Sequence, residues 1–188
     1  MRIISGKYKG RTLIAPPEGT RPTADRAKEM LFDMLTSLLM KEGKRWENLT
    51  FVDVFAGSGA VGLEAVSRGC KQVSLFENNG LAQKVIRQNG KDMNFELLGD
   101  ALKPSEAKMP VDILFMDPPY GKELWKQALP QFLNQGWIDE STLVIIEEDK
   151  KNQIEILPHF VLTEKRPSGR NTFYFLKNTC LFLPFGLK

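Results

Sequence analysis

Histidine and cysteine are scarce in this chain of 188 residues, which contains one His and two Cys. The single histidine, His159, leaves little basis for a zinc site built from several histidines or for a Ser–His triad. The cysteines, Cys70 and Cys180, form neither a metal-binding spacing nor a disulfide framework. Such usage is typical of a reducing cytoplasm, so we expect a cytoplasmic protein without a metal. Any catalysis would then depend on carboxylates, the backbone and a cofactor.

Long apolar runs are also missing. No run reaches the roughly 18 apolar residues of a membrane span, and the first residues lack the apolar core of a secretory signal. We therefore expect neither a membrane contact nor secretion. The length predicts a single domain over 1–188, with an N-terminal basic hairpin (1–22), a catalytic core (23–178) and an apolar tail (179–188).

Positive charge is concentrated at the start of the chain. The net charge is +3, yet residues 1–28 contain seven basic and two acidic residues, a local net charge of +5. Scattered lysines most often mark a solvated face. The alternative is an arm that contacts the phosphates of a nucleic acid.

The apolar pattern predicts an α/β fold. A helix with its N-cap at Thr23 precedes apolar strands at 49–55, 72–76, 95–98, 111–116 and 142–146, which alternate with helices at 60–68, 81–90 and 122–133. Such alternation predicts a mostly parallel sheet with helices on both faces. Two final strands, 159–164 and 172–176, flank a short glycine-containing loop and predict an antiparallel edge hairpin. Residues 1–15 predict a separate small hairpin.

A glycine loop follows the first parallel strand. Gly57, Gly59 and Gly62 form G-x-G-x-x-G, which lets the backbone turn tightly and approach a ligand at the start of a helix. The motif alone does not distinguish a dinucleotide from another adenosine cofactor. Glu77, twenty residues after Gly57, is placed to bind ribose hydroxyls, and Asp100 is placed to bind an adenine amino group. Either acid could instead be a solvated residue at a strand end.

Asp117-Pro118-Pro119-Tyr120 ends the strand 111–116 abruptly. The two prolines remove backbone donors and fix two φ angles, which produces a rigid turn at the carboxyl end of a buried strand. The turn offers a carboxylate, free carbonyls and an aromatic ring, the groups needed to hold a flat base that carries an amine. The alternative is a plain strand-terminating turn.

Two features favour S-adenosylmethionine over NAD as the cofactor. Asp53 lies inside the first strand, where an acid suits a cationic cofactor and would repel a pyrophosphate. An NAD enzyme also has no evident need for the Asp-Pro-Pro-Tyr turn. The alternative for Asp53 is a side chain that caps the amides of its own loop.

Several motifs resemble one enzyme family. Residues 53–59 resemble the first motif of class I S-adenosylmethionine-dependent methyltransferases, and 117–120 resemble the (D/N)PP(Y/F) motif of those that methylate amino nitrogens. Residues 1–11, Thr20-Arg21-Pro22-Thr23, 55–65 and 67–69 are similar to RsmD-type bacterial 16S rRNA guanine-N2 methyltransferases. The resemblance covers Met1 to about Lys177, and the apolar residues 181–188 depart from it.

The resemblance implies a Rossmann-like class I methyltransferase fold and a cytoplasmic enzyme that uses S-adenosylmethionine. Its substrate would be one guanine of small-subunit ribosomal RNA, presented within an assembling ribonucleoprotein. Asp117 and the Pro118 carbonyl would accept the two N–H bonds of the target amine, and Tyr120 would stack on the base.

The candidate residues fall into three sets. The catalytic set is Asp117, Pro118, Pro119 and Tyr120. The cofactor set is Asp53, Phe55, Ala56, Gly57, Ser58, Gly59, Glu77, Asn78, Asp100 and Ala101. The RNA set is Lys7, Lys9, Arg11, Arg21 and Thr23, although Arg21 could equally hold the cofactor carboxylate.

Three other functions fit part of the sequence. A related amino-methylase could act on adenine in DNA or on glutamine in protein, but Asp at position 117 and the basic hairpin favour a nucleic acid. An NAD oxidoreductase explains the glycines but not Asp53. A non-catalytic RNA-binding domain explains only the charge.

Overall fold

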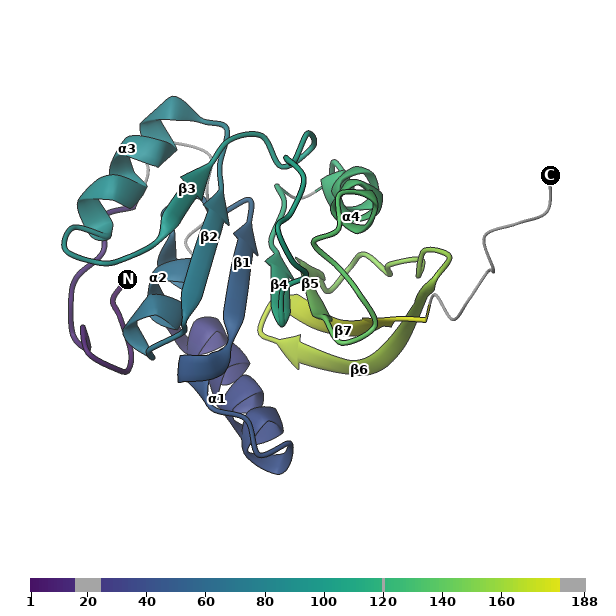
Figure 1. Cartoon of the computed structure of the whole chain (residues 1–188), viewed down its shortest axis with the longest axis horizontal. Helices are drawn as coiled ribbons and strands as arrows, with labels where there is room; N and C mark the ends of the chain where they lie inside the picture. Colours follow the sequence, from purple (N-terminus) through teal and green to yellow (C-terminus); the bar gives the residue numbers. More distant parts are fainter. Residues whose placement is uncertain (16–24, 120, 180–188) are drawn as a thin grey trace.

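The computed structural model describes residues 1–15, 25–119 and 121–179 (Figure 1). Its centre is a seven-stranded sheet in the order β3-β2-β1-β4-β5-β7-β6. The strands are β1 (Thr50–Val54), β2 (Gln72–Phe76), β3 (Glu96–Leu98), β4 (Ile113–Met116), β5 (Leu143–Asp149), β6 (Phe160–Ser168) and β7 (Asn171–Asn178). The helices are α1 (Asp25–Lys41), α2 (Ala60–Ser67), α3 (Gly80–Asn89) and α4 (Leu124–Asn134), with a 3₁₀ turn at Trp46–Asn48.

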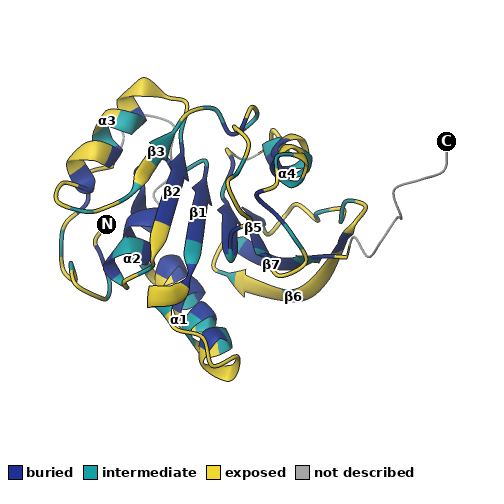
Figure 2. Cartoon of the chain, viewed as in Figure 1, coloured by how far each residue is buried: buried dark blue, intermediate teal, exposed yellow. Residues whose placement is uncertain are grey.

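Strands β1 to β5 are parallel, and β7 and β6 are antiparallel to their neighbours, as the sequence predicts. The parallel strands β1, β2, β4 and β5 bury both faces, whereas β3 at the edge contains no buried residue (Figure 2). On one face, Phe51 and Phe115 pack with α1, α2 and α3. On the other face, Val52 and Leu114 pack with α4. This three-layer arrangement explains the nearly continuous apolar runs of the parallel strands.

The chain order reverses between β1 and β4. The sheet continues from β1 through β2 to β3 in one direction and from β4 to β5 in the other. In open α/β sheets, ligands bind at such a switch point, in the crevice beyond the carboxyl ends of the strands. Both the glycine loop after β1 and the Asp-Pro-Pro turn after β4 lie at this point.

The C-terminal hairpin is longer than the sequence predicts. Strand β6 continues to Ser168 and β7 begins at Asn171, so only Gly169 and Arg170 form the turn. Gly169 has φ of 61° and thus adopts the left-handed region that short hairpin turns require. The tight turn allows the ladder to continue, so the predicted end of the first strand at Glu164 is four residues too early and the predicted start of the second at Thr172 is one residue too late.

The predicted N-terminal hairpin is present and packs against α2. Arg2 pairs with Thr12, and the Glu64 carboxylate of α2 accepts the amides of Ile4 and Ser5 at 2.7 and 3.0 Å. Glu64 also forms a fully buried ion pair with Lys28. Lys28 therefore contributes no exposed charge to the basic N-terminal segment.

The tip of this hairpin lies at the amino edge of the sheet. The Lys7 amide donates to the Ser67 carbonyl at the end of α2, and α2 returns the chain from the carboxyl edge to the amino edge. Gly6 has φ of 81°, and a Cβ there would lie 1.8 Å from the Ser67 oxygen, so only glycine fits. Among the described residues, no helix is both long and apolar enough to cross a membrane.

Candidate active site at the carboxyl edge

Acidic residues gather at the carboxyl edge of the sheet. Three stand just beyond the ends of parallel strands: Glu77 after β2, Asp100 after β3 and Asp117 after β4. A fourth, Glu147, lies within β5, directly after its parallel pairing with β4 ends at Ile146. Glu77, Asp100 and Asp117 are candidate residues from the sequence, whereas Glu147 is not among those candidates. The rule that locates Glu77 also applies to Glu147, because it follows the predicted strand 142–146 directly.

The glycine loop is held in an unusual backbone shape. Phe55, Gly57 and Gly59 have φ of 67°, 58° and 76°, all in the left-handed region. For Phe55 this conformation is strained, since it is uncommon for a bulky residue. The Ala56 amide bonds to the Phe76 carbonyl of β2, which fixes the start of the loop. Ser58 is buried, and its carbonyl accepts the Asn89 side-chain amide at 3.0 Å.

Two carboxylates accept hydrogen bonds from backbone amides of the glycine motif. Glu77 accepts the Gly57 N–H at 2.8 Å, and Asp53 accepts the Gly62 N–H at 2.7 Å. In a dinucleotide site the pyrophosphate oxygens accept hydrogen bonds from such amides, and two carboxylates at the same place would repel the pyrophosphate. The arrangement thus disfavours a dinucleotide and fits a cofactor that carries positive charge near Asp53. The alternative interpretation of Asp53, a cap on its own loop, describes the bond that it makes here.

Burial changes the protonation of two of these acids. Burial raises the pKa of Asp53 to about 7, helped by the nearby Glu77 and Glu147 carboxylates and opposed by the Gly62 amide. Burial also raises the pKa of Glu147, against the bond from Asn171. A cation that enters this edge would favour the ionised forms of both groups.

Asp53→Asn is expected to flatten the dependence of stability on pH. Because the native pKa of Asp53 lies above its unfolded value of 3.8, the native state retains a proton that the unfolded chain loses. The stability from this site is complete below pH ~4 and is lost as pH rises through ~7, by about 2–3 kcal/mol between pH 5 and 8. The melting temperature of the wild type, relative to that of the variant, should therefore fall over this range. Asp33→Asn, at an exposed position, should leave the dependence of melting temperature on pH as in the wild type. If the melting temperatures of Asp53→Asn and the wild type followed parallel curves against pH, the pKa assigned to Asp53 would be contradicted.

The other predicted cofactor residues lie at the same edge. Asp100 is half-buried and accepts the Leu102 amide at 3.0 Å, and Ala101 beside it is buried. Asn78 is exposed. The next residue, Asn79, caps α3 by accepting the Leu81 and Ala82 amides, a structural role that was not among the expectations from the sequence.

The Asp-Pro-Pro turn begins where the sequence predicts, directly after Met116. Asp117 is half-buried, and its amide remains within 3.4 Å of the Val54 carbonyl of β1, so the ladder persists through Asp117. Pro118 is buried and Pro119 is exposed. Tyr120, Arg21 and Thr23 lie outside the described residues, so their predicted roles stay predictions.

Three predicted RNA contacts lie away from this turn. Lys7 and Lys9 are exposed near the hairpin tip, at the amino edge. The Arg11 guanidinium donates to the Asn89 and Lys91 carbonyls at 3.4 and 2.6 Å and stacks over the Tyr8 ring. Arg11 therefore has a structural role at the end of α3 in addition to any contact with RNA.

A second basic surface lies beside the candidate site. Lys150 and Lys151 follow β5, and Arg170 forms the β6–β7 turn; all three are exposed, and the Lys150 amide donates to the Arg170 carbonyl at 2.8 Å. We refer to these three residues as the carboxyl-edge basic surface. Within the described part of the chain, none of them forms an ion pair. This surface cannot be predicted from the sequence, because Arg170 lies about twenty residues after the two lysines and meets them only through the β5–β7 pairing.

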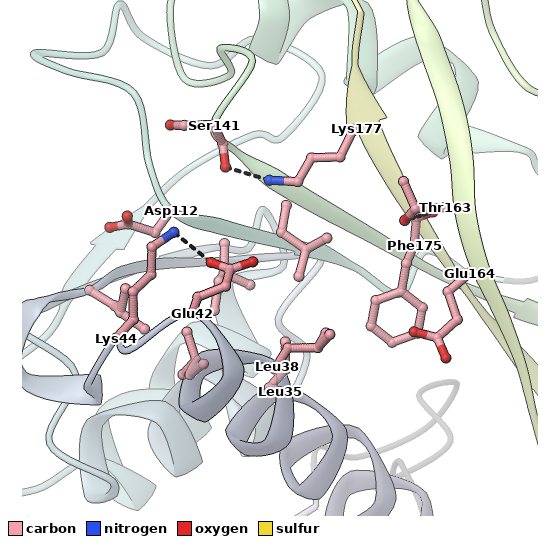
Figure 3. A pocket seen from close by; sticks show the side chains of 14 residues that line it. Leu35, Leu38, Glu42, Lys44, Asp112, Ser141, Thr163, Glu164, Phe175 and Lys177 are labelled. Carbon is pink, nitrogen blue, oxygen red and sulfur yellow. Dashed lines mark hydrogen bonds and ion pairs between the residues drawn. The ribbon is translucent and has the colours of Figure 1, made fainter.

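The structure also contains a cavity of about 300 Å³ at the opposite, amino edge of the sheet. Leu35 and Leu38 of α1 line it together with Asp112, Phe175 and Lys177 (Figure 3). The Lys177 ammonium donates to the Ser141 carbonyl at its rim. Since Asp112 precedes β4 and Asp117 follows it, this cavity is separate from the acidic edge.

Comparison with known proteins identifies the family. The family described as "Conserved hypothetical protein 95" matches residues 1–177. The chain belongs to this family. Ribosomal RNA small subunit methyltransferase D of Buchnera aphidicola subsp. Acyrthosiphon pisum is 32% identical over 180 residues, which cover 92% of this chain and 90% of the relative. The resemblance to RsmD-type methyltransferases is thereby confirmed.

Solved structures agree on the fold. A hypothetical protein of Thermus thermophilus is 29% identical, with a TM-score of 0.76 over 94% of this chain and 99% of the other. The ribosomal protein L11 methylase of Lactobacillus delbrueckii subsp. bulgaricus, 19% identical, has a TM-score of 0.56 over 78% and 77% of the two chains. The second likeness shows the fold alone. The Rossmann-like methyltransferase architecture expected from the sequence is confirmed.

Proposed function

We propose that this protein is an S-adenosylmethionine-dependent enzyme that methylates the exocyclic N2 amine of one guanine in 16S ribosomal RNA. The observation that carries the proposal is the pairing, at one switch point, of an acid-lined glycine loop with an Asp-Pro-Pro turn. The names of the relatives support ribosomal RNA as the substrate. The enzyme would act in the cytoplasm, on RNA within an assembling small subunit.

The acceptor amine would be held by the turn after β4. Its nitrogen is a weak nucleophile because the purine ring withdraws the lone pair. The Asp117 carboxylate and the Pro118 carbonyl would accept its two N–H bonds and direct the lone pair at the methyl group. Holding the two reactants in this way contributes most of the rate, since alignment alone is worth several kcal/mol. Asp117 is half-buried, which allows a base to reach it while limiting competition from water.

The cofactor would lie over the glycine loop. When bound, S-adenosylmethionine supplies a methyl group that its positively charged sulfur already activates. Gly57 and Gly59 permit a close approach of the backbone. Glu77 and Asp100 are partly exposed at this edge and would bind the ribose and adenine groups.

The direct test is methylation of assembled small subunits with a labelled methyl donor, followed by digestion of the RNA and identification of the product nucleoside. We expect N2-methylguanosine at one position. In parallel assays with DNA or protein as the acceptor, label in N6-methyladenosine or in glutamine would instead support a related amino-methylase. If the protein transferred the methyl group to none of these acceptors, the proposal would be rejected.

The carboxyl-edge basic surface is expected to bind the phosphates that flank the target guanine. Lys150 lies three residues beyond Glu147, about 10 Å along a strand, which is a suitable distance from a base held at Asp117. Lys150→Ala/Lys151→Ala/Arg170→Ala should raise KM for ribosomal substrate. It should also reduce the salt dependence of binding by roughly one slope unit for each phosphate that the variant no longer binds. Activity and binding measured against salt concentration check this, with cofactor affinity unchanged.

A charge-matched control is Lys41→Ala/Lys71→Ala/Arg87→Ala, which changes exposed residues nearer the amino edge. Equal effects of the two triple variants would show only a general charge effect and contradict the assignment. The predicted RNA contact of the N-terminal hairpin is best examined with Lys7→Ala/Lys9→Ala. That variant preserves the packing of Arg11 against α3, so a loss of binding would not reflect a damaged hairpin.

A further inference from the structure

Glu147 is a buried carboxyl group without a role in the chemistry described so far. Its side chain is 0% exposed. Its Oε1 accepts a hydrogen bond from the Asn171 side-chain amide of β7. Its Oε2 is enclosed, and within the described residues no group donates to it. A buried acceptor that lacks a donor is uncommon in native proteins and requires a physical explanation.

Glu147 lies beside the catalytic turn. In the parallel β4–β5 ladder Ile146 is opposite Met116, so the following residues, Glu147 and Asp117, are neighbours on strands about 4.8 Å apart. Phe115 and Ile145 are directed to the face covered by α1. Since side chains alternate along a strand, Asp117 and Glu147, two residues further on, are directed to the same face.

Guanine presents donors that match this pair of carboxyl groups. Its N2 amine is adjacent to the ring N1–H, so two donors stand side by side on one edge of the base. Adenine and 2-aminopurine have an acceptor at N1 instead. An acceptor at the position of Glu147 would therefore attract guanine and repel both of these bases. Enzymes that act on an extruded base commonly read it along this edge.

We propose that Glu147 selects guanine, its Oε2 accepting the N1–H of the base whose 2-amine Asp117 holds. This assignment rests on the proposed guanine-N2 activity. A base that enters beside Asp117 supplies the donor that Oε2 lacks in the free protein. Because Oε2 is enclosed, the surrounding side chains must shift locally as the base enters, a common change on binding.

The test compares guanine with 2-aminopurine at the target position of the RNA. The analogue keeps the 2-amine and replaces the N1–H with an acceptor. The wild type should prefer guanine by about 100-fold or more in kcat/KM, because a site built to accept a hydrogen bond discriminates strongly against an analogue without the donor. Glu147→Gln can donate to N1 through its side-chain amide. It should therefore reduce that preference at least ~10-fold.

Glu148→Gln is the matched control. Glu148 is the next residue on β5, is also buried, and accepts the Asp149 amide and the Asn152 side-chain amide. The preference of the Glu148→Gln variant for guanine over 2-aminopurine should equal that of the wild type. A purely structural role for Glu147 would lower kcat/KM for both bases equally and leave the preference intact, which would overturn the proposal.

The wild type alone provides a second test that does not depend on folding of the variant. Use of guanine and 2-aminopurine within about threefold of each other would overturn the role of Glu147, whatever the variant does. Failure of the underlying function would look different. The wild type would then form no N2-methylguanosine at all on unmodified RNA.

Discussion

Asp117→Ala is expected to reduce kcat by about 10²–10³-fold or more, because positioned polar groups at a reacting centre contribute on this scale. The variant loses the carboxylate that orients the acceptor amine. Affinity for S-adenosylmethionine should remain close to that of the wild type, since the glycine loop and Glu77 are held by bonds that do not involve Asp117. Single-turnover methylation and calorimetric titration with the cofactor measure the two effects separately.

Asp112→Ala provides the control for Asp117. Asp112 precedes the same strand at its amino end and accepts the Thr50 amide and hydroxyl at 2.8 and 2.9 Å. Its removal should lower the melting temperature and leave kcat of the folded enzyme near the wild-type value. A comparable decrease of kcat in both variants would show that β4 is merely being destabilised. Near-normal turnover of Asp117→Ala would reject the assigned chemistry.

The fold could be predicted from the sequence because its elements obey local rules. The alternation of buried strands and helices from Leu49 onward, and the glycine-containing loop near Gly169, determine a parallel sheet with an antiparallel edge. The ends of the last hairpin could not be predicted, because β6 and β7 extend through mutual pairing up to the Gly169–Arg170 turn. Pairing between strands is a non-local property that residue preferences do not contain.

The candidate site was predictable where it depends on position along one strand. Glu77 and Asp117 were found because an acid that follows a parallel strand must lie at the carboxyl edge. The bond of Asp53 to the Gly62 amide matches the loop cap that the sequence offers as an alternative. The bond of Glu77 to the Gly57 amide could not be predicted, since it depends on how β1 and β2 pack. The location of the hairpin tip depends likewise on where α2 ends, at Ser67.

The charge of the N-terminal segment illustrates the same limit. Its count of basic residues predicts a phosphate-binding arm, yet Lys28 is buried against Glu64 and Arg11 caps the end of α3. Neither fact can be read from composition. The carboxyl-edge basic surface shows the converse, because Lys150 and Arg170 are brought together only by tertiary structure.

Gly57→Val is expected to abolish measurable binding of S-adenosylmethionine while the protein stays folded. Gly57 has φ of 58°, is buried, and donates its amide to Glu77. A β-branched residue is strained at this φ, and its side chain would stand where the cofactor must approach the backbone. Strain of about 1–3 kcal/mol that the free loop relieves by shifting, and that the bound shape would restore, weakens binding up to ~100-fold before any direct clash is counted.

Gly43→Val tests whether backbone strain alone explains such a loss. Gly43 has φ of 66°, with no atom within 4 Å of the position that a Cβ would take, and it lies just beyond α1 at the amino edge. The two variants should lose similar amounts of thermal stability, because both place valine in the left-handed region. Only Gly57→Val should lose the calorimetric signal of the cofactor. Unchanged cofactor affinity in Gly57→Val would contradict the location of the site over the glycine loop. Tight binding of NAD by the wild type, with no response to S-adenosylmethionine, would reject the cofactor itself.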